Sequence, residues 1–263
     1  MNRQIGIIGA GNIGGAIARG LVRHGDVPAG QILLSRKREE LLSDFEGQGF
    51  RIADNETIVG QCDIIILSVL PGQAEAVIRS LAGSLDAERH ILASIVSAVS
   101  IREIRGWIGN NTPVVRFMAN TAVEYGASMT CIAGEDEQAN EAIRKLFDSL
   151  GKTMIIPEQL MPAATILAAC GIAFFLRFIR AVSQGGIQIG FHADEAGFIA
   201  AQTALGAARL LMHTKNHPET EIDRVTTPMG CTISGLNEME HYGLSSAMIK
   251  GIIRSFEGIS ELK

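Results

Sequence analysis

Short apolar runs alternate with segments of helical spacing over the first 156 residues of the chain. The apolar runs are Ile5–Ile8, Ile32–Ser35, Ile64–Val69, Ile91–Ile95, Val114–Phe117 and Thr153–Ile156. Helical periodicity lies between them, over Ile13–His24, Arg38–Glu46, Gln73–Leu85 and Glu137–Leu150. Apolar runs without polar alternation are typical of strands buried on both faces of a sheet. The pattern predicts an α/β domain over residues 1–157, with a doubly wound, mostly parallel sheet.

The pattern changes near Pro157, and no strand-like run bounded by turn residues follows it. Residues 158–263 are predicted to form an all-α domain. Its segment Asp194–His213 begins with a candidate N-cap and is rich in alanine and glycine, which predicts a packed, largely buried helix. A domain of about 100 residues buries too little surface to cover such a helix by itself. We therefore predict that this domain forms a homodimer, or a higher oligomer built from dimers.

Composition narrows the class of protein further. Hydrophobic residues make up 47% of the chain and the formal net charge is −5, which argues against a nucleic-acid partner. The most apolar stretch, Ile166–Val182, is interrupted by Arg177 and Arg180, so we expect no membrane span. The cysteines lack the spacing of a metal site or a disulfide framework, which predicts a cytoplasmic protein without a bound metal; they are Cys62, Cys131, Cys170 and Cys231.

A glycine-rich turn follows the first predicted strand and opens the first predicted helix. It reads Gly9-Ala10-Gly11-Asn12-Ile13-Gly14, the G-x-G-x-x-G spacing in the context that a dinucleotide site requires. Gly9 permits the tight turn, Gly11 lets the backbone approach a pyrophosphate, and Gly14 lets the helix pack on the strand. The first helical residues, Asn12 and Ile13, supply free N–H groups to the phosphates. The first domain is therefore predicted to be a Rossmann-like cofactor domain.

The end of the second predicted strand bears on the choice between NAD and NADP. An NAD site carries an acidic residue there, which accepts a hydrogen bond from the ribose 2′-hydroxyl. This chain has Ser35, Arg36 and Lys37 instead, and no acid before Glu39. These residues favour a 2′-phosphate, and so NADPH over NADH, although an ordinary solvated basic turn has the same composition.

Three further segments are expected to border the cofactor at the carboxyl edge of the sheet, where open α/β sheets bind ligands. One follows the long apolar strand and contains Ser68, Val69 and Pro71. The second contains Ser97, after the run that ends at Ile95. Asn55 opens a short helix, where it either contacts the adenosine ribose or acts only as part of a helix cap.

Motifs along the whole chain resemble those of the pyrroline-5-carboxylate reductases. The segment Val225–Leu236 reads V-T-T-P-M-G-C-T-I-S-G-L, close to the family's V-x-[ST]-P-G-G-[TA]-T-I-x-[GA]-L. Arg116–Ala122 is similar to its R-x-M-P-N-T-P, and Gln202–Ala208 to its Q-T-x-x-G-[AS]-A. The resemblance implies NADPH-dependent reduction of the C=N bond of a cyclic imine carboxylate, 1-pyrroline-5-carboxylate to L-proline, the last step of proline biosynthesis.

The resemblance also implies a site. The substrate carboxylate is expected on backbone N–H groups of the loop Thr227–Thr232, which feeds a helix and so suits an anion. The implied substrate-binding residues are Val225, Thr227, Met229, Gly230, Cys231 and Asn120. The implied catalytic residue is Thr232, whose hydroxyl would hydrogen-bond the ring nitrogen. An N-cap threonine is equally consistent with this spacing.

Several positions depart from the family pattern. The family's S-G-S-G-P-A-Y is Ala168–Phe174 here, its Lys-Pro is Leu70-Pro71, and its A-A-G is Val96-Ser97-Ala98. Two prolines are replaced by Ala119 and Ala122, and the first glycine of the G-G pair by Met229. Two alternatives therefore stay open: a reductase of another imine or a small hydroxyacid, and an NADP-binding paralogue without turnover.

Overall fold

A computed structural model describes residues 3–259 and divides the chain into two compact units. The first unit comprises the described residues of Met1–Cys170 and of Ser255–Lys263, and the second is Gly171–Arg254. Residues 1–2 of the predicted cofactor domain and residues 260–263 of the predicted helical domain lie outside the described residues.

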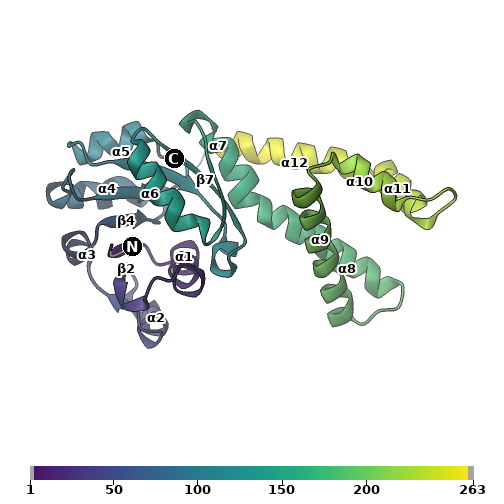
Figure 1. Cartoon of the computed structure of the whole chain (residues 1–263), viewed down its shortest axis with the longest axis horizontal. Coiled ribbons are helices and arrows are strands. Elements are labelled where there is room, and N and C mark those ends of the chain that lie inside the picture. The colour runs from purple at the N-terminus through teal and green to yellow at the C-terminus, as the bar shows by residue number, and fades with distance from the viewer. Residues whose placement is uncertain (1–2, 260–263) are drawn as a thin grey trace. The chain divides into compact units, whose positions relative to one another are not determined.

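The first unit contains one eight-stranded sheet in the order β3-β2-β1-β4-β5-β6-β7-β8 (Figure 1). All neighbouring strands are parallel except β6 and β7, which are antiparallel. The doubly wound, mostly parallel sheet predicted from the apolar runs is confirmed. The strands are β1 (Ile5–Ile8), β2 (Ile32–Ser35), β3 (Arg51–Ile52), β4 (Ile64–Leu67), β5 (Ile91–Ser94), β6 (Val114–Met118), β7 (Ser128–Gly134) and β8 (Gly151–Ile155).

Helices cover both faces of this sheet, which explains why its central strands are apolar throughout. In β4, Ile64 and Ile66 belong to one buried cluster, whereas Ile65 and Leu67 belong to another. The first cluster includes residues of α1 (Asn12–His24), α2 (Ser43–Gly47), α6 (Glu137–Asp148) and α7 (Met161–Ala164). The second includes residues of α3 (Asn55–Gln61), α4 (Pro71–Leu81) and α5 (Ile101–Ile108).

Short 3-10 turns connect these elements; they are η1 (Ala29–Gln31), η2 (Glu39–Leu41), η3 (Ala82–Ser84), η4 (Thr121–Tyr125) and η5 (Glu158–Leu160). Two strands and one helix carry no strong sequence signal. β7 reads S-M-T-C-I-A-G, with no continuous β-branched run, and β3 has two residues. Pairing with neighbouring strands, rather than local propensity, places such segments in a sheet. Helix α5 was likewise not predicted, although it begins with a capping box between Ser100 and Glu103.

The predicted domain boundary at 157 differs from the division of the structure after Cys170. Beyond Pro157 the chain is helical, but Met161, Ala164 and Ala168 are buried in the core on the sheet. The helical run from Glu158 to Gln188 therefore begins in the first unit. It passes through a π-helical turn, η6 (Thr165–Cys170), before α8 (Gly171–Gln188) opens the second unit.

The second unit is helical throughout, as predicted for this part of the chain. Its elements are α8, α9 (Ala193–Thr214), α10 (Pro218–Val225), α11 (Cys231–His241) and α12 (Leu244–Gly258), whose last residues group with the first unit. Helices α8 and α9 pack closely, since a Cβ on Gly186 would lie 3.0 Å from that of Ala196. Helix α9 begins after His192 rather than at Asp194, and the backbone N–H of His192 donates to Glu195.

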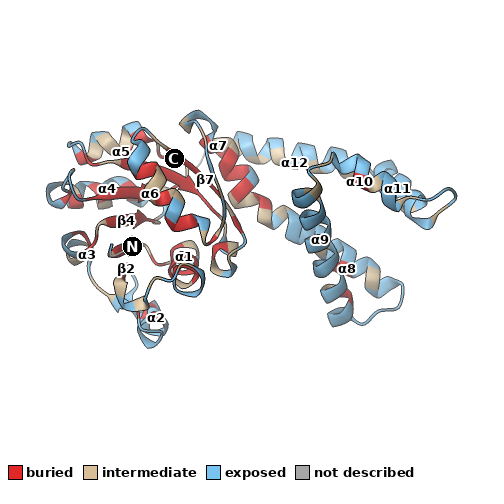
Figure 2. Ribbon diagram, viewed as in Figure 1, coloured by how far each residue is buried: buried red, intermediate tan, exposed pale blue. Residues whose placement is uncertain are grey.

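Most residues of this second unit are exposed, whereas the core of the first unit is buried (Figure 2). The exposed residues of the second unit include large apolar side chains such as Phe175, Phe198 and Met212. In α9 only Ala196 and Ala200 are buried, so the prediction of a largely buried helix is not met within one chain. The run Glu158–Gln188 is also long and apolar enough, by length and composition alone, to cross a membrane, since an 18-residue window within it has a mean hydropathy of 1.9. The sequence analysis had singled out Ile166–Val182 within this run as the most apolar stretch, and it expected no membrane span because Arg177 and Arg180 interrupt that stretch. An exposed apolar surface of this extent marks an interaction site.

We expect this surface to be covered by a second copy of the chain. Light scattering at micromolar concentration should give at least twice the 28.1 kDa of one chain, and a mass of a single chain would contradict the prediction. Phe198→Glu places a charge on α9 where the side chain is 73% exposed, and should lower the mass. Tyr125→Glu, at a side chain 70% exposed on the first unit, is the matched control and should leave the mass unchanged.

Candidate active site

The turn between β1 and α1 depends on two glycines. Gly9 has a φ of +100° and a Cβ there would lie 2.7 Å from the Ser68 carbonyl oxygen. A Cβ on Gly14 would lie 2.6 Å from both the Gly9 carbonyl oxygen and Ser68 Oγ. Because real side chains do not tolerate such distances, both glycines are required by the packing of the chain itself.

Gly11 differs from these two glycines in its surroundings. A Cβ there would meet nothing closer than the Gly9 carbonyl oxygen, at 3.9 Å, so the fold does not exclude a side chain. The predicted role of Gly11, to let the backbone approach a pyrophosphate, requires such open space. Asn12 and Ile13 follow at the start of α1, where the first N–H groups of a helix lack intrahelical acceptors. These residues fit the pyrophosphate of a dinucleotide.

Hydrogen bonds bring the end of β2 to the glycine-rich turn. The Ser35 carbonyl accepts from the N–H groups of Gly9 and Ala10, at 3.0 and 2.9 Å. The Ser35 hydroxyl donates to Asn55 Oδ1 at 2.6 Å, so both residues lie together at the carboxyl edge of the sheet. Asn55 is not the cap of α3; Asp54 caps it by accepting from the Thr57 N–H.

Two cations follow Ser35 at this edge. Arg36 is half-buried and Lys37 is exposed, and neither forms a hydrogen bond or ion pair with another described residue. These two unpaired cations lie just after the strand end that bonds the glycine-rich turn, and they add positive charge there. An anionic group on the ribose would find donors there without displacing an internal partner.

The loops after β4 and β5 reach the same edge. Ser68 Oγ donates to the Gly9 carbonyl at 2.9 Å, and a Cβ on Gly9 would lie 3.0 Å from Val69 Cγ1. Pro71 is the first residue of α4. Ser97 is half-buried, and the next residue, Ala98, has a φ of +60°. Non-glycine residues adopt this left-handed conformation at a cost in free energy.

In the second unit, residues 227–230 form a tight turn before α11. The Gly230 N–H donates to the Thr227 carbonyl at 2.9 Å, and Met229 between them has a φ of +58°. A proline followed by a residue of positive φ is the arrangement of a type II turn, which normally has glycine at that second position. The Met229 side chain is fully exposed, so internal packing does not hold it in this conformation.

Thr232 is the second residue of α11, and Gly230 is the N-cap. The alternative that Thr232 is itself an N-cap is therefore wrong. Its hydroxyl forms no hydrogen bond with another described residue. Gly230 caps without a side chain, so the N–H groups of Cys231, Thr232 and Ile233 also lack protein acceptors. Val225 and Cys231, the other predicted substrate residues of this segment, are exposed.

Asn120, in the first unit, is hydrogen-bonded to the protein at four points, one of them its carbonyl, which accepts from the Val123 N–H at 3.1 Å. Its Nδ2 donates to the Ala168 carbonyl at 2.9 Å, and its Oδ1 accepts from the Ala122 N–H at 3.0 Å. Its backbone N–H donates to Ser128 Oγ at 3.2 Å. Substrate binding by Asn120 stays a prediction. The structure shows that Asn120 already has hydrogen-bond partners within the protein, which the sequence did not indicate.

A buried ion pair also escaped the sequence analysis. Arg116 of β6 is 5% exposed and donates from Nη1 to Glu158 Oε1 at 3.1 Å. The same carboxylate oxygen accepts from the Ile101 N–H at the start of α5, at 2.7 Å. Burial lowers the pKa of Arg116, which Glu158 opposes, and Arg116 Nε is buried without a partner. The only sequence signal was the arginine of the motif Arg116–Ala122.

The cysteines differ in their exposure: Cys62 and Cys131 are buried, Cys170 is half-buried and Cys231 is exposed. All four are free, and burial raises the pKa of Cys62 to about 11, which keeps it a thiol. Burial likewise raises the pKa values of Cys131 and Cys170. Among residues 3–259, no group of three or more His, Cys, Asp and Glu side chains could hold a metal ion.

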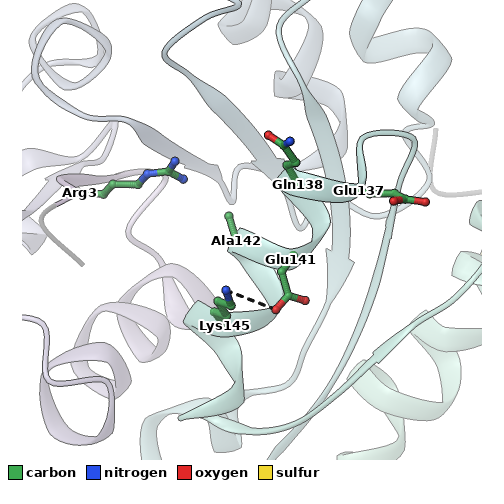
Figure 3. Close-up of a pocket in the computed structure, with 6 residues that line it drawn as sticks. All are labelled: Arg3, Glu137, Gln138, Glu141, Ala142 and Lys145. Atoms are coloured by element: carbon green, nitrogen blue, oxygen red, sulfur yellow. Dashed lines mark ion pairs between the residues drawn. The ribbon is translucent and has the colours of Figure 1, made fainter.

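An open groove of about 580 Å³ lies on α6, away from these loops (Figure 3). Its lining is charged and partly paired, with Lys145 Nζ 3.6 Å from Glu141 Oε1. Arg3 contributes to it from the start of the chain, before β1, whereas Gly9 follows β1. The groove is therefore at the amino edge of the strand, opposite to the edge at which α/β sheets bind ligands.

Comparison with known proteins places the chain in a family. Residues 158–262 match the family model described as pyrroline-5-carboxylate reductase dimerisation, and residues 4–98 match NADP oxidoreductase, coenzyme F420-dependent. Pyrroline-5-carboxylate reductase 2 of Dictyostelium discoideum is 44% identical over 99% of this chain and 93% of its own length. The chain belongs to the pyrroline-5-carboxylate reductase family. It is thus an NADP-dependent oxidoreductase by family.

Other relatives extend this comparison. Pyrroline-5-carboxylate reductase 1 of the same organism is 43% identical over 98% of this chain, which spans about half (49%) of that relative's length. The structure of a reductase of this family from Streptococcus pyogenes matches with a TM-score of 0.86 at 27% identity, covering 98% of both chains. The Plasmodium falciparum pyrroline carboxylate reductase with NADP bound has the same fold, with a TM-score of 0.90 at 20% identity, covering 99% of this chain and 98% of its own.

Two departures from the family pattern acquire a physical meaning. Ala98 and Met229 stand where the pattern has glycine, and both have positive φ. The backbone at both positions therefore keeps a conformation that glycine adopts freely and other residues adopt with strain.

Met229→Gly and Ala98→Gly should each raise the free energy of unfolding by about 1 kcal/mol, because strain at positive φ is relieved. Thermal denaturation should show a Tm increase of about 2–4 °C. Lys215→Gly is the matched control: Lys215 has a φ of +57° at the end of α9, outside the predicted site. It should raise Tm similarly and leave activity unchanged. A lowered Tm in both site variants would show that side-chain contacts outweigh the strain.

Proposed function

We propose that this chain reduces the C=N bond of a cyclic imine carboxylate with NADPH, and that its substrate is 1-pyrroline-5-carboxylate and its product L-proline. The observation that carries the proposal is the start of α11. Three N–H groups without protein acceptors and one free hydroxyl, that of Thr232, lie within one helical turn. The names of the relatives support the same substrate.

The N-terminus of α11 suits a carboxylate for two reasons. The N–H groups of Cys231, Thr232 and Ile233 can donate to its oxygens, and the helix dipole adds a positive potential. The Gly230 N–H is already bonded to Thr227 and is not available. Thr227, Met229 and Gly230 form the turn that aims the helix N-terminus, and Val225 ends the preceding helix.

The chemistry requires little acid–base work from the protein. When bound, NADPH supplies the hydride that reduces the electrophilic carbon of the imine. A protonated imine is already the electrophile, so the protein contributes orientation and electrostatic stabilisation. Thr232 can hydrogen-bond the ring nitrogen through its hydroxyl, which orients the ring while the carboxylate is held by the backbone.

We assign the cofactor site to residues of the first unit. Gly9 and Gly14 shape the turn, the phosphates bind against Gly11 and the N–H groups of Asn12 and Ile13 at the start of α1, and Ser35, Arg36 and Lys37 favour NADPH over NADH. Asn55 borders the adenosine ribose. Ser68, Val69, Pro71 and Ser97 border the nicotinamide. Arg36 and Lys37 support this assignment because neither is committed to another described residue.

We further propose that the enzyme is a cytoplasmic homodimer, or an oligomer of dimers. The exposed apolar surface of the second unit and the family's dimerisation model support the assembly. Four free cysteines suit a reducing compartment.

The deciding assay follows NADPH oxidation with 1-pyrroline-5-carboxylate and, for comparison, with six-membered cyclic imines. Small hydroxyacids are tested separately as substrates for oxidation by NADP+. Turnover should be greatest with the five-membered ring. Faster turnover of another imine or of a hydroxyacid would show that 1-pyrroline-5-carboxylate is not the preferred substrate. NADPH binding without any turnover would favour the alternative that this chain is an NADP-binding paralogue without activity. That alternative is based on the segment Ala168–Phe174, which departs from the family pattern.

Cofactor preference depends on the charge at the end of β2. Arg36→Ala should weaken NADPH binding about tenfold or more and leave NADH binding unchanged, because a charge-assisted phosphate contact contributes about 1.5–3 kcal/mol. Binding can be measured by fluorescence titration. Arg38→Ala removes a nearby cation as the control. Equal affinity of the parent for NADPH and NADH would refute the preference.

The role of Thr232 can be tested with two variants that lack its hydroxyl. Thr232→Ala and Thr232→Val should lower kcat/KM for 1-pyrroline-5-carboxylate about ten- to hundredfold, because one hydrogen bond to the reacting ring is lost. NADPH affinity should not change. Thr226→Val is the control, since the Thr226 hydroxyl donates to the Asp223 carbonyl. Parent-like kinetics in both Thr232 variants would remove Thr232 from the mechanism.

A further inference from the structure

The helical run that leads into the second unit widens into a π-helical turn at its boundary. The turn, η6, ends at Cys170, and the second unit begins at Gly171. Within it, the Thr165 hydroxyl donates back to the Met161 carbonyl at 2.8 Å, and Ala168 is buried. π-Helical turns are rare in proteins, and many of those that occur lie at functional sites. They interrupt the regular hydrogen bonding of the helix.

Asn120 supplies a hydrogen bond to this turn from a distant part of the chain. Its Nδ2 donates to the Ala168 carbonyl at 2.9 Å across a sequence separation of 48 residues. At the same time its Oδ1 caps η4 by accepting from the Ala122 N–H. One side-chain amide thus joins the π-helical turn to η4.

Helix α1, which begins at the phosphate-binding turn, holds η4 from its other side. A Cβ on Gly20 of α1 would lie 2.4 Å from the Val123 carbonyl oxygen, so the two backbones are in direct contact. Glu124 forms ion pairs with Arg19 and Arg23 of α1, at 3.1 and 2.8 Å. Contacts therefore run without a break from α1 through η4 and Asn120 to the turn Thr165–Cys170.

We propose that Asn120 is a positioning residue that couples cofactor binding at α1 to the conformation of the π-helical turn Thr165–Cys170. Its amide holds the turn in one arrangement by satisfying the Ala168 carbonyl. NADPH at the start of α1 stabilises η4, and through Asn120 it stabilises the turn from which the helical unit begins. The expected effect of Asn120 on the rate of turnover rests on the proposed reductase function, whereas its effect on the conformation of the π-helical turn does not.

Asn120→Asp removes one of the two hydrogen bonds of the side-chain amide and keeps the other. The carboxylate can still accept from the Ala122 N–H, but it cannot donate to the Ala168 carbonyl. Asn110 provides a matched control, because its Nδ2 donates to the Leu85 carbonyl at 2.8 Å and its Oδ1 accepts from the Thr112 N–H at 2.9 Å. Asn110→Asp thus makes the same chemical change away from the π-helical turn. Asn120→Ala serves as a second variant if the introduced charge prevents folding.

Hydrogen–deuterium exchange of residues 165–170 is the first measurement. In the parent, saturating NADPH should slow exchange about threefold or more. In Asn120→Asp, exchange without cofactor should be about tenfold faster, and NADPH should no longer slow it. By linkage, the affinity for NADPH should fall by no more than the factor by which NADPH protects the turn. Asn110→Asp should behave as the parent does.

Steady-state kinetics with 1-pyrroline-5-carboxylate is the second measurement. Asn120→Asp should lower kcat about tenfold, with KM for the imine within about twofold of the parent. A raised KM with unchanged exchange would overturn the proposal and make Asn120 a substrate contact. Unchanged protection of the turn by NADPH in Asn120→Asp would also overturn it. A parent that does not turn over would refute the reductase function alone, since the exchange measurements need no reaction.

Discussion

The close approach of α1 to β1 and β4 is the constraint on which the rest of the cofactor domain depends. It exists because Gly9 and Gly14 have no side chains: a Cβ on either would overlap the Ser68 residue that follows β4. This approach places the N-terminus of α1 at the carboxyl edge of the sheet, beside the ends of β2 and β4. Ser35 then bonds the same turn through its carbonyl, so three strand ends converge on one point. Gly11, which the packing does not require, is left facing open space where a ligand can approach.

The proposed chemistry of this protein rests on backbone conformation more than on charged side chains. The start of α11 presents N–H groups because a turn of four residues ends there and its cap has no side chain. Ala98 and Met229 each keep a left-handed conformation without being glycine, and around Met229 the hydrogen bond from the Gly230 N–H to the Thr227 carbonyl closes the turn. Strain of this kind persists only where the surrounding structure determines the backbone, and it is concentrated at functional sites. A reductase whose substrate is already an electrophile has little need of a buried acid or base.

Long-range polar contacts tie the helical run after β8 to the sheet. Glu158 joins β6 to the start of α5 through Arg116 and the Ile101 N–H, and Asn120 joins η4 to the π-helical turn. Both contacts lie in the first unit, which explains why the compact unit extends to Cys170. The buried charge of Arg116 needs Glu158, because an unpaired guanidinium in this position would carry the full cost of desolvation.

The sequence by itself determined the alternating strands and helices, the glycine-rich turn, the basic end of β2 and the turn before α11. These features are local: periodicity reports which faces are buried, and glycine and proline report where the backbone turns. Tertiary structure alone decided that β7 runs antiparallel to β6, that Arg116 pairs with Glu158 42 residues away, and that Asn120 bonds Ala168. It also placed Gly230, not Thr232, at the cap of α11. The reason is that a polar side chain has many acceptors of equal chemistry along the chain, and only packing brings one of them within reach.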